Sequence, residues 1–149
     1  MQKILLSILI FVFISCSSNK NESSEVIVPV KTPVSLSGCY QMIIENDTAT
    51  LKIVQQNDSI SGDLIYNRYE KDDNTGRFAG KITDDKIIGW YTFNSEGIIS
   101  IRQVIFKIDS TSLYEGYGDI EQRNDSAIFS YPQTLDYETK HPFLKTDCK

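Results

Sequence analysis

The sequence predicts an all-β fold: a single eight-stranded antiparallel up-and-down meander closed as a small barrel. Three observations support this prediction. Apolar and polar residues alternate from residue 35 onward, as they do in half-buried strands. Turn motifs rich in Asn, Asp, Ser and Gly recur at regular spacing, and no window after residue 35 carries an apolar stripe of helical period. Because the connections are short, each strand is expected to pair with its neighbour.

Residues 1–15 have the features of a signal peptide, with an early Lys3, an apolar run and the small Ser15 before Cys16. Ser15 followed directly by Cys16 resembles the lipobox of bacterial lipoproteins. This resemblance implies that Cys16 is acylated and becomes the first mature residue. Ser17 resembles the residue found there in lipoproteins sent to the outer membrane. The alternatives are an uncleaved anchor helix and a plain signal peptide that leaves Cys16 free.

The polar and Pro-punctuated stretch that follows has no means of burying a core. We therefore expect a lipoprotein signal peptide at 1–15, a lipidated flexible tether at 16–35 and a β-barrel domain at 36–149.

Seven turn motifs divide the body of the chain. They lie at residues 45–48, 56–59, 71–76, 84–85, 94–97, 109–111 and 123–126. The strands between them are expected near 38–44, 48–55, 59–69, 76–83, 86–93, 98–108, 112–121 and 126–130. Closing such a sheet into a barrel covers its apolar face and hides its edges. The alternative is a flattened sandwich or a half-barrel closed by the segment after residue 131.

The first expected strand opens with Gly38-Cys39-Tyr40. Together with the eight-stranded meander, this tripeptide resembles the Gly-x-Trp opening of small lipocalin-like (calycin) lipoproteins, with Tyr40 where Trp is usual. As a whole, the chain is similar to envelope lipoproteins of Bacteroidetes, a likeness that implies no activity.

The net charge of −5 argues against nucleic acid as a partner, since binding phosphates needs a basic face. His141 is the only histidine and lies in a polar tail that we expect to be exposed. A catalytic triad and a multi-histidine metal site are therefore excluded. Asp72 and Asn74 imitate only the beginning of a calcium loop. We expect no metal, no cofactor and no enzymatic activity.

Two cysteines remain once Cys16 is assigned to the lipid. Cys39 and Cys148 form an even pair in an oxidising compartment, where such pairs usually form a disulfide. This bond would hold the C-terminal tail across the first strand. The alternative is two free thiols.

A charged pair is expected on one face of two neighbouring strands, which is either the inner face or, since Ile99, Ile101 and Ile105 make the opposite face equally apolar, the outer one. Arg102 shares a strand face with apolar residues, while Glu115 and Tyr117 share a face of the next strand. A turn near residues 109–110 would place Arg102 opposite Tyr117 or Asp119, with Glu115 one diagonal step away. Since a buried charge is costly unless paired, the group either closes the barrel structurally or contacts a polar ligand. Trp90 and its aromatic neighbours would line a ligand cup or fill the core.

Asp followed by a hydroxyl residue recurs at four turns and resembles the O-glycosylation motif of Bacteroidetes envelope proteins. The candidate acceptors are Thr48, Ser59, Ser110 and Ser126. Ordinary turn chemistry explains the same residues.

Together these features predict a lipid-anchored protein of the outer membrane, attached to the membrane through Cys16. Its expected role is non-enzymatic binding of a small amphipathic ligand or of an envelope partner. The alternative is a structural or accessory lipoprotein with a filled core and no ligand.

Overall fold

The computed structural model describes residues 35–148, so the predicted signal peptide and Cys16 lie outside the described residues. The described chain is all-β and forms an eleven-stranded, mostly antiparallel sheet. Its elements are β1 (Gly38–Ile44), β2 (Asp47–Gln56), β3 (Ser59–Asn67), β4 (Asn74–Thr83), β5 (Lys86–Ser95), β6 (Ile98–Asp109), β7 (Ser112–Tyr117), β8 (Ile120–Arg123), β9 (Ser126–Phe129), a 3-10 helix η1 (Pro132–Thr134), β10 (Asp136–Tyr137) and β11 (Leu144–Thr146).

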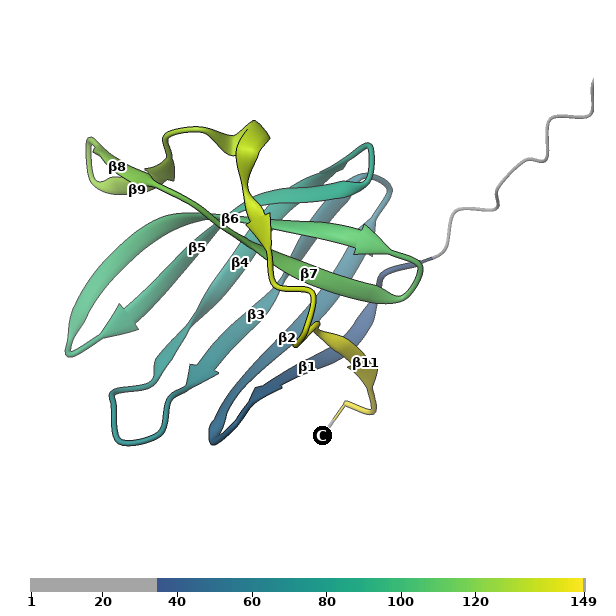
Figure 1. The fold of residues 1–149 in the computed structure, drawn as a ribbon, viewed down its shortest axis with the longest axis horizontal. Coiled ribbons are helices and arrows are strands. Elements are labelled where there is room, and N and C mark those ends of the chain that lie inside the picture. The colour runs from purple at the N-terminus through teal and green to yellow at the C-terminus, as the bar shows by residue number, and fades with distance from the viewer. Residues whose placement is uncertain (1–34, 149) are drawn as a thin grey trace, which may run out of the picture. The chain divides into compact units, whose positions relative to one another are not determined.

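Strands β1 to β7 form the predicted antiparallel meander, in which each strand pairs with the next along the chain (Figure 1). Most of the hairpin loops contain two residues, and the first of them has a positive φ. A left-handed first residue is what the favoured two-residue hairpin loops require, and its polar side chain tolerates that conformation. These residues are Glu45, Asn57, Asp84, Glu96, Ser110 and Asn124.

The prediction of eight strands is wrong in the last part of the sheet. The expected strand 112–121 is interrupted after Tyr117, and the chain resumes at Ile120 as β8, which pairs with β9 in a hairpin. β9 lies parallel to β6, so one strand pair of the sheet, outside the meander, is not antiparallel. Gly118 lies at the break, where a β-carbon would be only 2.7 Å from Leu135, and glycine is a weak strand former.

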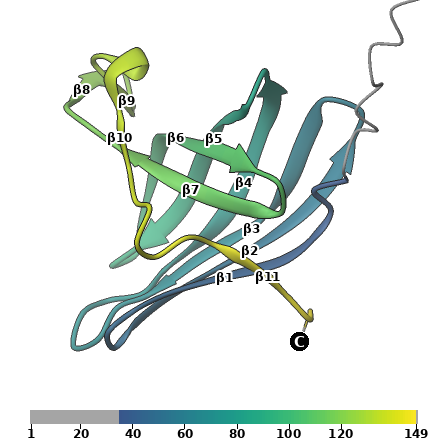
Figure 2. The same ribbon diagram turned by 45° about the vertical axis from the view of Figure 1, so that its right-hand side comes forward.

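The C-terminal segment contacts both end strands of the meander. Phe143 exchanges two backbone hydrogen bonds with Leu113 of β7, at 3.1 and 2.8 Å. The next residues form β11, which pairs with β1 (Figure 2). The predicted disulfide between Cys39 and Cys148 is confirmed, with 5.2 Å between the two α-carbons. The tail is therefore held on β1 by backbone pairing and by a covalent bond.

The inner face of the sheet carries the core, as the alternation predicts. Edge-to-face contacts join Phe106 to Phe78 and to Phe143, with ring centroids 5.7 and 5.5 Å apart. The other buried core side chains come from β1 to β7 and from Leu36: Tyr40, Met42, Ala49, Leu51, Ile53, Ile60, Leu64, Tyr66, Ile87, Tyr91, Val104 and Leu113.

A glycine on the inner face permits a close approach between strands. A β-carbon at Gly89 would lie 2.6 Å from the carbonyl oxygen of Ala79 and 2.7 Å from the ring of Phe78. This position on β5 therefore excludes a side chain, as expected where a sheet bends tightly. Within residues 35–148 no helix has the length and apolarity that crossing a bilayer would require.

Candidate functional site

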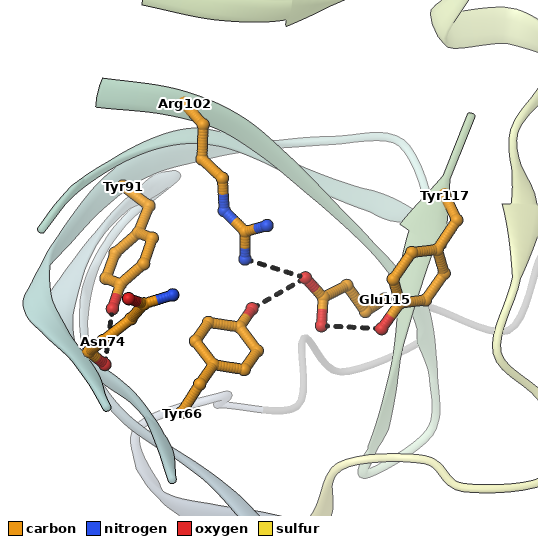
Figure 3. A network of polar contacts seen from close by, with 6 residues as sticks. All are labelled: Tyr66, Asn74, Tyr91, Arg102, Glu115 and Tyr117. Carbon is orange, nitrogen blue, oxygen red and sulfur yellow. Dashed lines mark hydrogen bonds and ion pairs between the residues drawn. The ribbon is translucent and has the colours of Figure 1, made fainter. Parts of the chain in front are cut away.

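Glu115 is a buried carboxylate on β7, with only 3% of its surface exposed. Three side chains converge on it (Figure 3). The Tyr66 hydroxyl donates to Oε1 at 2.7 Å, the Tyr117 hydroxyl donates to Oε2 at 3.2 Å, and Nη2 of Arg102 donates to Oε1 at 3.5 Å. A buried charge is thus paired and hydrogen-bonded, which is the condition for tolerating it.

Pairing between strands places these side chains on one face. Arg102 lies directly opposite Tyr91 of β5. The ladder between β6 and β7 ends at the pair Phe106 and Glu115, and the other partner of Arg102 is Ala127 of β9. The prediction that Arg102 lies opposite Tyr117 or Asp119 is therefore wrong, because β7 leaves β6 before that point. Glu115 still meets Arg102 because the long guanidinium side chain extends toward it.

Aromatic rings hold the guanidinium of Arg102. Its central carbon lies 5.0 Å from the ring centroid of Tyr66, 5.5 Å from that of Tyr91 and 5.9 Å from that of Phe93. The rings of Tyr91 and Phe93 are themselves stacked, with centroids 4.7 Å apart. The hydroxyl of Tyr91 donates to the backbone oxygen of Asn74 at 2.9 Å. The cation is thus stabilised by ring faces that supply no strong hydrogen-bond acceptor.

Most hydrogen-bond donors of Arg102 have no acceptor among the described residues. A guanidinium has about five N–H groups. The Nη2 contact with Glu115 is the one hydrogen bond that this side chain makes within residues 35–148. Nε is buried and has no partner there. The arrangement can therefore accept a further polar group with oxygen atoms.

Burial shifts the acid–base properties of the group. Desolvation raises the pKa of Glu115, although Arg102 and the two tyrosine hydroxyls oppose this effect. Burial and the nearby carboxylate raise the pKa of Tyr66 well above its ordinary value. Desolvation also raises the pKa of Tyr91 to about 12. The tyrosines consequently remain hydrogen-bond donors at neutral pH.

A cavity of about 300 Å³ opens beside Arg102 and Glu115. Buried Met42 and Tyr66 lie at its inner side, while Arg68 and Lys71 of the β3–β4 loop are exposed at its rim. Its full lining is Met42, Ile44, Asp47, Thr48, Tyr66, Asn67, Arg68, Lys71, Arg102, Glu115 and Tyr117. The cavity thus combines an apolar wall, a buried ion pair and a rim of cationic side chains.

The structure brings together three of the four candidate ligand-binding residues, namely Arg102, Glu115 and Tyr117. Trp90 does not join them. It is 44% exposed and lines a separate surface cavity of about 440 Å³ with Gln103 and other residues. The alternation of β5 explains this, because Tyr91 faces the core and its neighbour Trp90 faces away.

The remaining candidate residues lie apart from the cavity or at its edge. Ser59 and Ser110 are exposed, whereas Thr48 and Ser126 are half-buried. The side chain of His141 is 40% exposed, and its Nδ1 lies 3.4 Å from Glu138. Residues 35–148 contain no group of three acidic, histidine or cysteine side chains placed to hold a metal ion.

Sequence reasoning missed Arg68 and Lys71 as site residues and treated Tyr66 only as one of many aromatics. The alternation of residues along this strand could have indicated that the side chain of Tyr66 faces inward, as it does in β3. Its contact with Glu115, 49 residues away, depends on the curvature of the whole sheet. Comparison of the chain with protein-family models, curated proteins and solved structures gives no match.

Proposed function

We propose that the chain is a lipid-anchored protein of the cell envelope whose β domain binds a small amphipathic ligand without transforming it. In this proposal residues 1–15 are removed, Cys16 is acylated and residues 16–35 connect the outer membrane to the domain. The lipobox-like sequence supports the anchor, and the cavity beside Arg102 supports the binding role.

The main support for ligand binding is that Arg102 lines a cavity while most of its N–H donors lack an acceptor among the described residues. An apolar side chain would fill such a position at lower cost if its role were only to close the core. Met42 and Ile44 supply apolar wall in the same cavity. A molecule with a polar end toward Arg102 and an apolar body toward β1 would satisfy both surfaces.

We propose further that the sheet closes as a lipocalin-like barrel through its C-terminal segment. The support is that Phe143 bonds to β7 while β11 bonds to β1. The aromatic cluster of Phe78, Phe106 and Phe143 fills one part of the interior, and none of these three rings lines the cavity beside Glu115.

The volume of the cavity indicates the size of the ligand. At about 300 Å³ it lies at the lower end of the range of roughly 300–1,000 Å³ that is typical of small-molecule sites. The proposed ligand is therefore a small one.

Native mass spectrometry of the protein purified gently from its own envelope, repeated after denaturation, tests the proposal. A mass lost on denaturation would support ligand binding, and the same spectra report any lipid on Cys16. Ile44→Trp should fill the cavity and remove the bound mass. Ile43→Trp is a matched control, because Ile43 is 56% exposed and outside the cavity lining.

A structural or accessory role is the second candidate, and the densely filled aromatic core is the observation that favours it. Identical masses before and after denaturation, with no ligand-dependent change in melting temperature, would support this role. An accessory protein of this kind should copurify with an envelope partner after mild cross-linking.

A further inference from the structure

We propose that the polar end of the ligand is a single acidic group, a carboxylate or a phosphate, which binds Arg102 while Glu115 takes up one proton. This inference rests on the proposed binding function, because it uses the same cavity. It adds the chemical class of the ligand and a way in which binding is regulated.

Arg102 has unused capacity to donate hydrogen bonds. Planar guanidinium donors match the paired oxygens of carboxylates and phosphates. In the described residues Arg102 uses one contact of 3.5 Å to Glu115, at the long limit of a hydrogen bond. An acid in the cavity would supply the missing acceptors at the one cation that lies on its inner side.

Cationic side chains outnumber acidic ones around the cavity. The lining contains Arg68, Lys71 and Arg102 against Asp47 and Glu115. Among residues 35–148, neither Arg68 nor Lys71 takes part in an ion pair within 4.0 Å. The chain as a whole carries a net charge of −5. The cavity is thus a locally positive site on an acidic protein, which attracts anions.

Glu115 already contacts Arg102 in the structure. A second carboxylate at the same guanidinium would place two like charges in a buried space with one cation between them. Protonation of Glu115 removes the conflict, and burial already raises the pKa of this carboxyl. Binding takes up one acid anion and one proton, and no covalent bond between heavy atoms changes. The protonated Glu115 can then donate its O–H to the bound acid.

Other charged and titratable groups face Glu115, and none of them replaces it as the proton acceptor. Burial raises the pKa of Tyr66, Tyr91 and Tyr117, so these tyrosines already hold their protons at neutral pH. Arg102 stays cationic. The pKa of Glu138, whose backbone N–H donates to the backbone oxygen of Glu115, is lowered by hydrogen bonds from the backbone N–H groups of Lys140 and His141.

Titration calorimetry on the full chain with three eight-carbon probes tests the inference. Octanoate and octyl phosphate carry the two acidic groups, and octanol is the neutral match of similar length. We expect at least one acid to bind about tenfold tighter than octanol, a difference of roughly 1.4 kcal/mol. Whichever acid binds more tightly identifies the preferred headgroup. Octanoate affinity should rise as the pH falls from about 8 to about 6, where octanoate itself stays ionised.

Proton uptake is measured by repeating the octanoate titration in buffers of different ionisation enthalpy. Glu115→Gln should keep the preference for acids and abolish the uptake. Asp63→Asn is the matched control, since this carboxylate lies on β3 outside the cavity lining and should leave the uptake unchanged. Arg102→Gln should remove the preference for acids. Arg68→Gln with Lys71→Gln should weaken both acids several-fold and leave octanol unchanged, and these exposed loop changes do not threaten folding.

The possible failures are distinguishable. Equal binding of octanol and both acids would overturn the acidic class and leave the binding function standing. A preference for acids without proton uptake would overturn the exchange at Glu115. No binding of any probe, with the wild-type chain folded by its thermal transition, would overturn both this inference and the proposed binding of small amphipathic ligands.

Discussion

Nη2 of Arg102 on β6 lies 3.5 Å from Oε1 of Glu115 on β7, although Arg102 lies beyond the last residue pair that joins these two strands. The ladder between β6 and β7 stops at Glu115, and β9 takes the place beside Arg102. The two side chains therefore bridge a divergence between strands at the inner side of the cavity. The pair therefore contributes both to the stability of the sheet and to the chemistry of the site.

Removing the cation should destabilise the domain, because Glu115 would keep a buried charge without its partner. We expect Arg102→Leu to lower the free energy of unfolding by about 3 kcal/mol, measured by urea denaturation. Arg77→Leu is the matched control, since Arg77 is 77% exposed and pairs with Asp63 on the surface. Its loss should stay below about 1 kcal/mol. Equal losses in the two variants would contradict the assignment of Arg102 to a buried pair.

Stability should depend on pH through Glu115. Its pKa is raised in the folded state from an ordinary value of 4.5, so folding favours the protonated carboxyl. This contribution is complete below pH 4.5 and is lost as the pH rises through the folded pKa. Glu115→Gln should therefore gain stability relative to the wild type as the pH increases, measured by denaturation at several pH values.

Glu138→Gln provides a control of opposite sign. Hydrogen bonds from the backbone N–H groups of Lys140 and His141 lower the pKa of Glu138. The stability that this carboxylate contributes is present above its ordinary pKa and is lost as the pH falls. Parallel pH profiles for the Glu115 and Glu138 variants would contradict both assignments.

Loss of the disulfide should destabilise the domain substantially. The bond joins residues 109 positions apart, and the chain-entropy description gives roughly 4–5 kcal/mol for a loop of this length. We expect the double variant Cys39→Ser with Cys148→Ser to melt at a lower temperature than the wild type. Adding a reductant should lower the melting temperature of the wild type and leave that of the variant unchanged. A reductant effect in both proteins would point to another cause.

Phe143 should be as important as a central strand residue, although it lies in an irregular tail. It is fully buried and packs edge-to-face on Phe106. Phe143→Ala should cost roughly 3–5 kcal/mol, the range for a buried aromatic. Leu144→Ala is the control, because Leu144 follows Phe143 directly in the chain and is 54% exposed. Limited proteolysis should cut the tail of the Phe143 variant first if the contact with Leu113 holds this segment in place.

The meander could be predicted from sequence because its determinants are local. Alternation assigns the inner face of each strand, and residues such as Asn57 and Asp84 suit the left-handed positions of two-residue loops. Alternation alone left the direction of Arg102 and Glu115 open, because the opposite face of the Arg102 strand is equally apolar in sequence. The predicted turn sites and the Cys39–Cys148 pairing needed no knowledge of the sheet's curvature.

The end of the sheet and the complete site depend on contacts between distant segments. The break after Tyr117 depends on Leu135, which packs on Gly118 from a segment beyond β9. The contact of Tyr66 with Glu115 depends on how far the intervening strands curve. Arg68 and Lys71 lie in the one long loop of the meander, where no periodic pattern indicates direction.

The Cys39–Cys148 bond also determines how the domain responds to cutting and pulling. The bond encloses residues 40–147 in a covalent ring. A protease that cuts a single loop, such as the one at Asn57, would leave both pieces attached to one another. A pulling force applied outside the two cysteines would pass through the sulfur atoms and bypass the hydrogen bonds of the sheet. The fold, including its cavity, is thus protected from tension along the chain for as long as the bond stays oxidised.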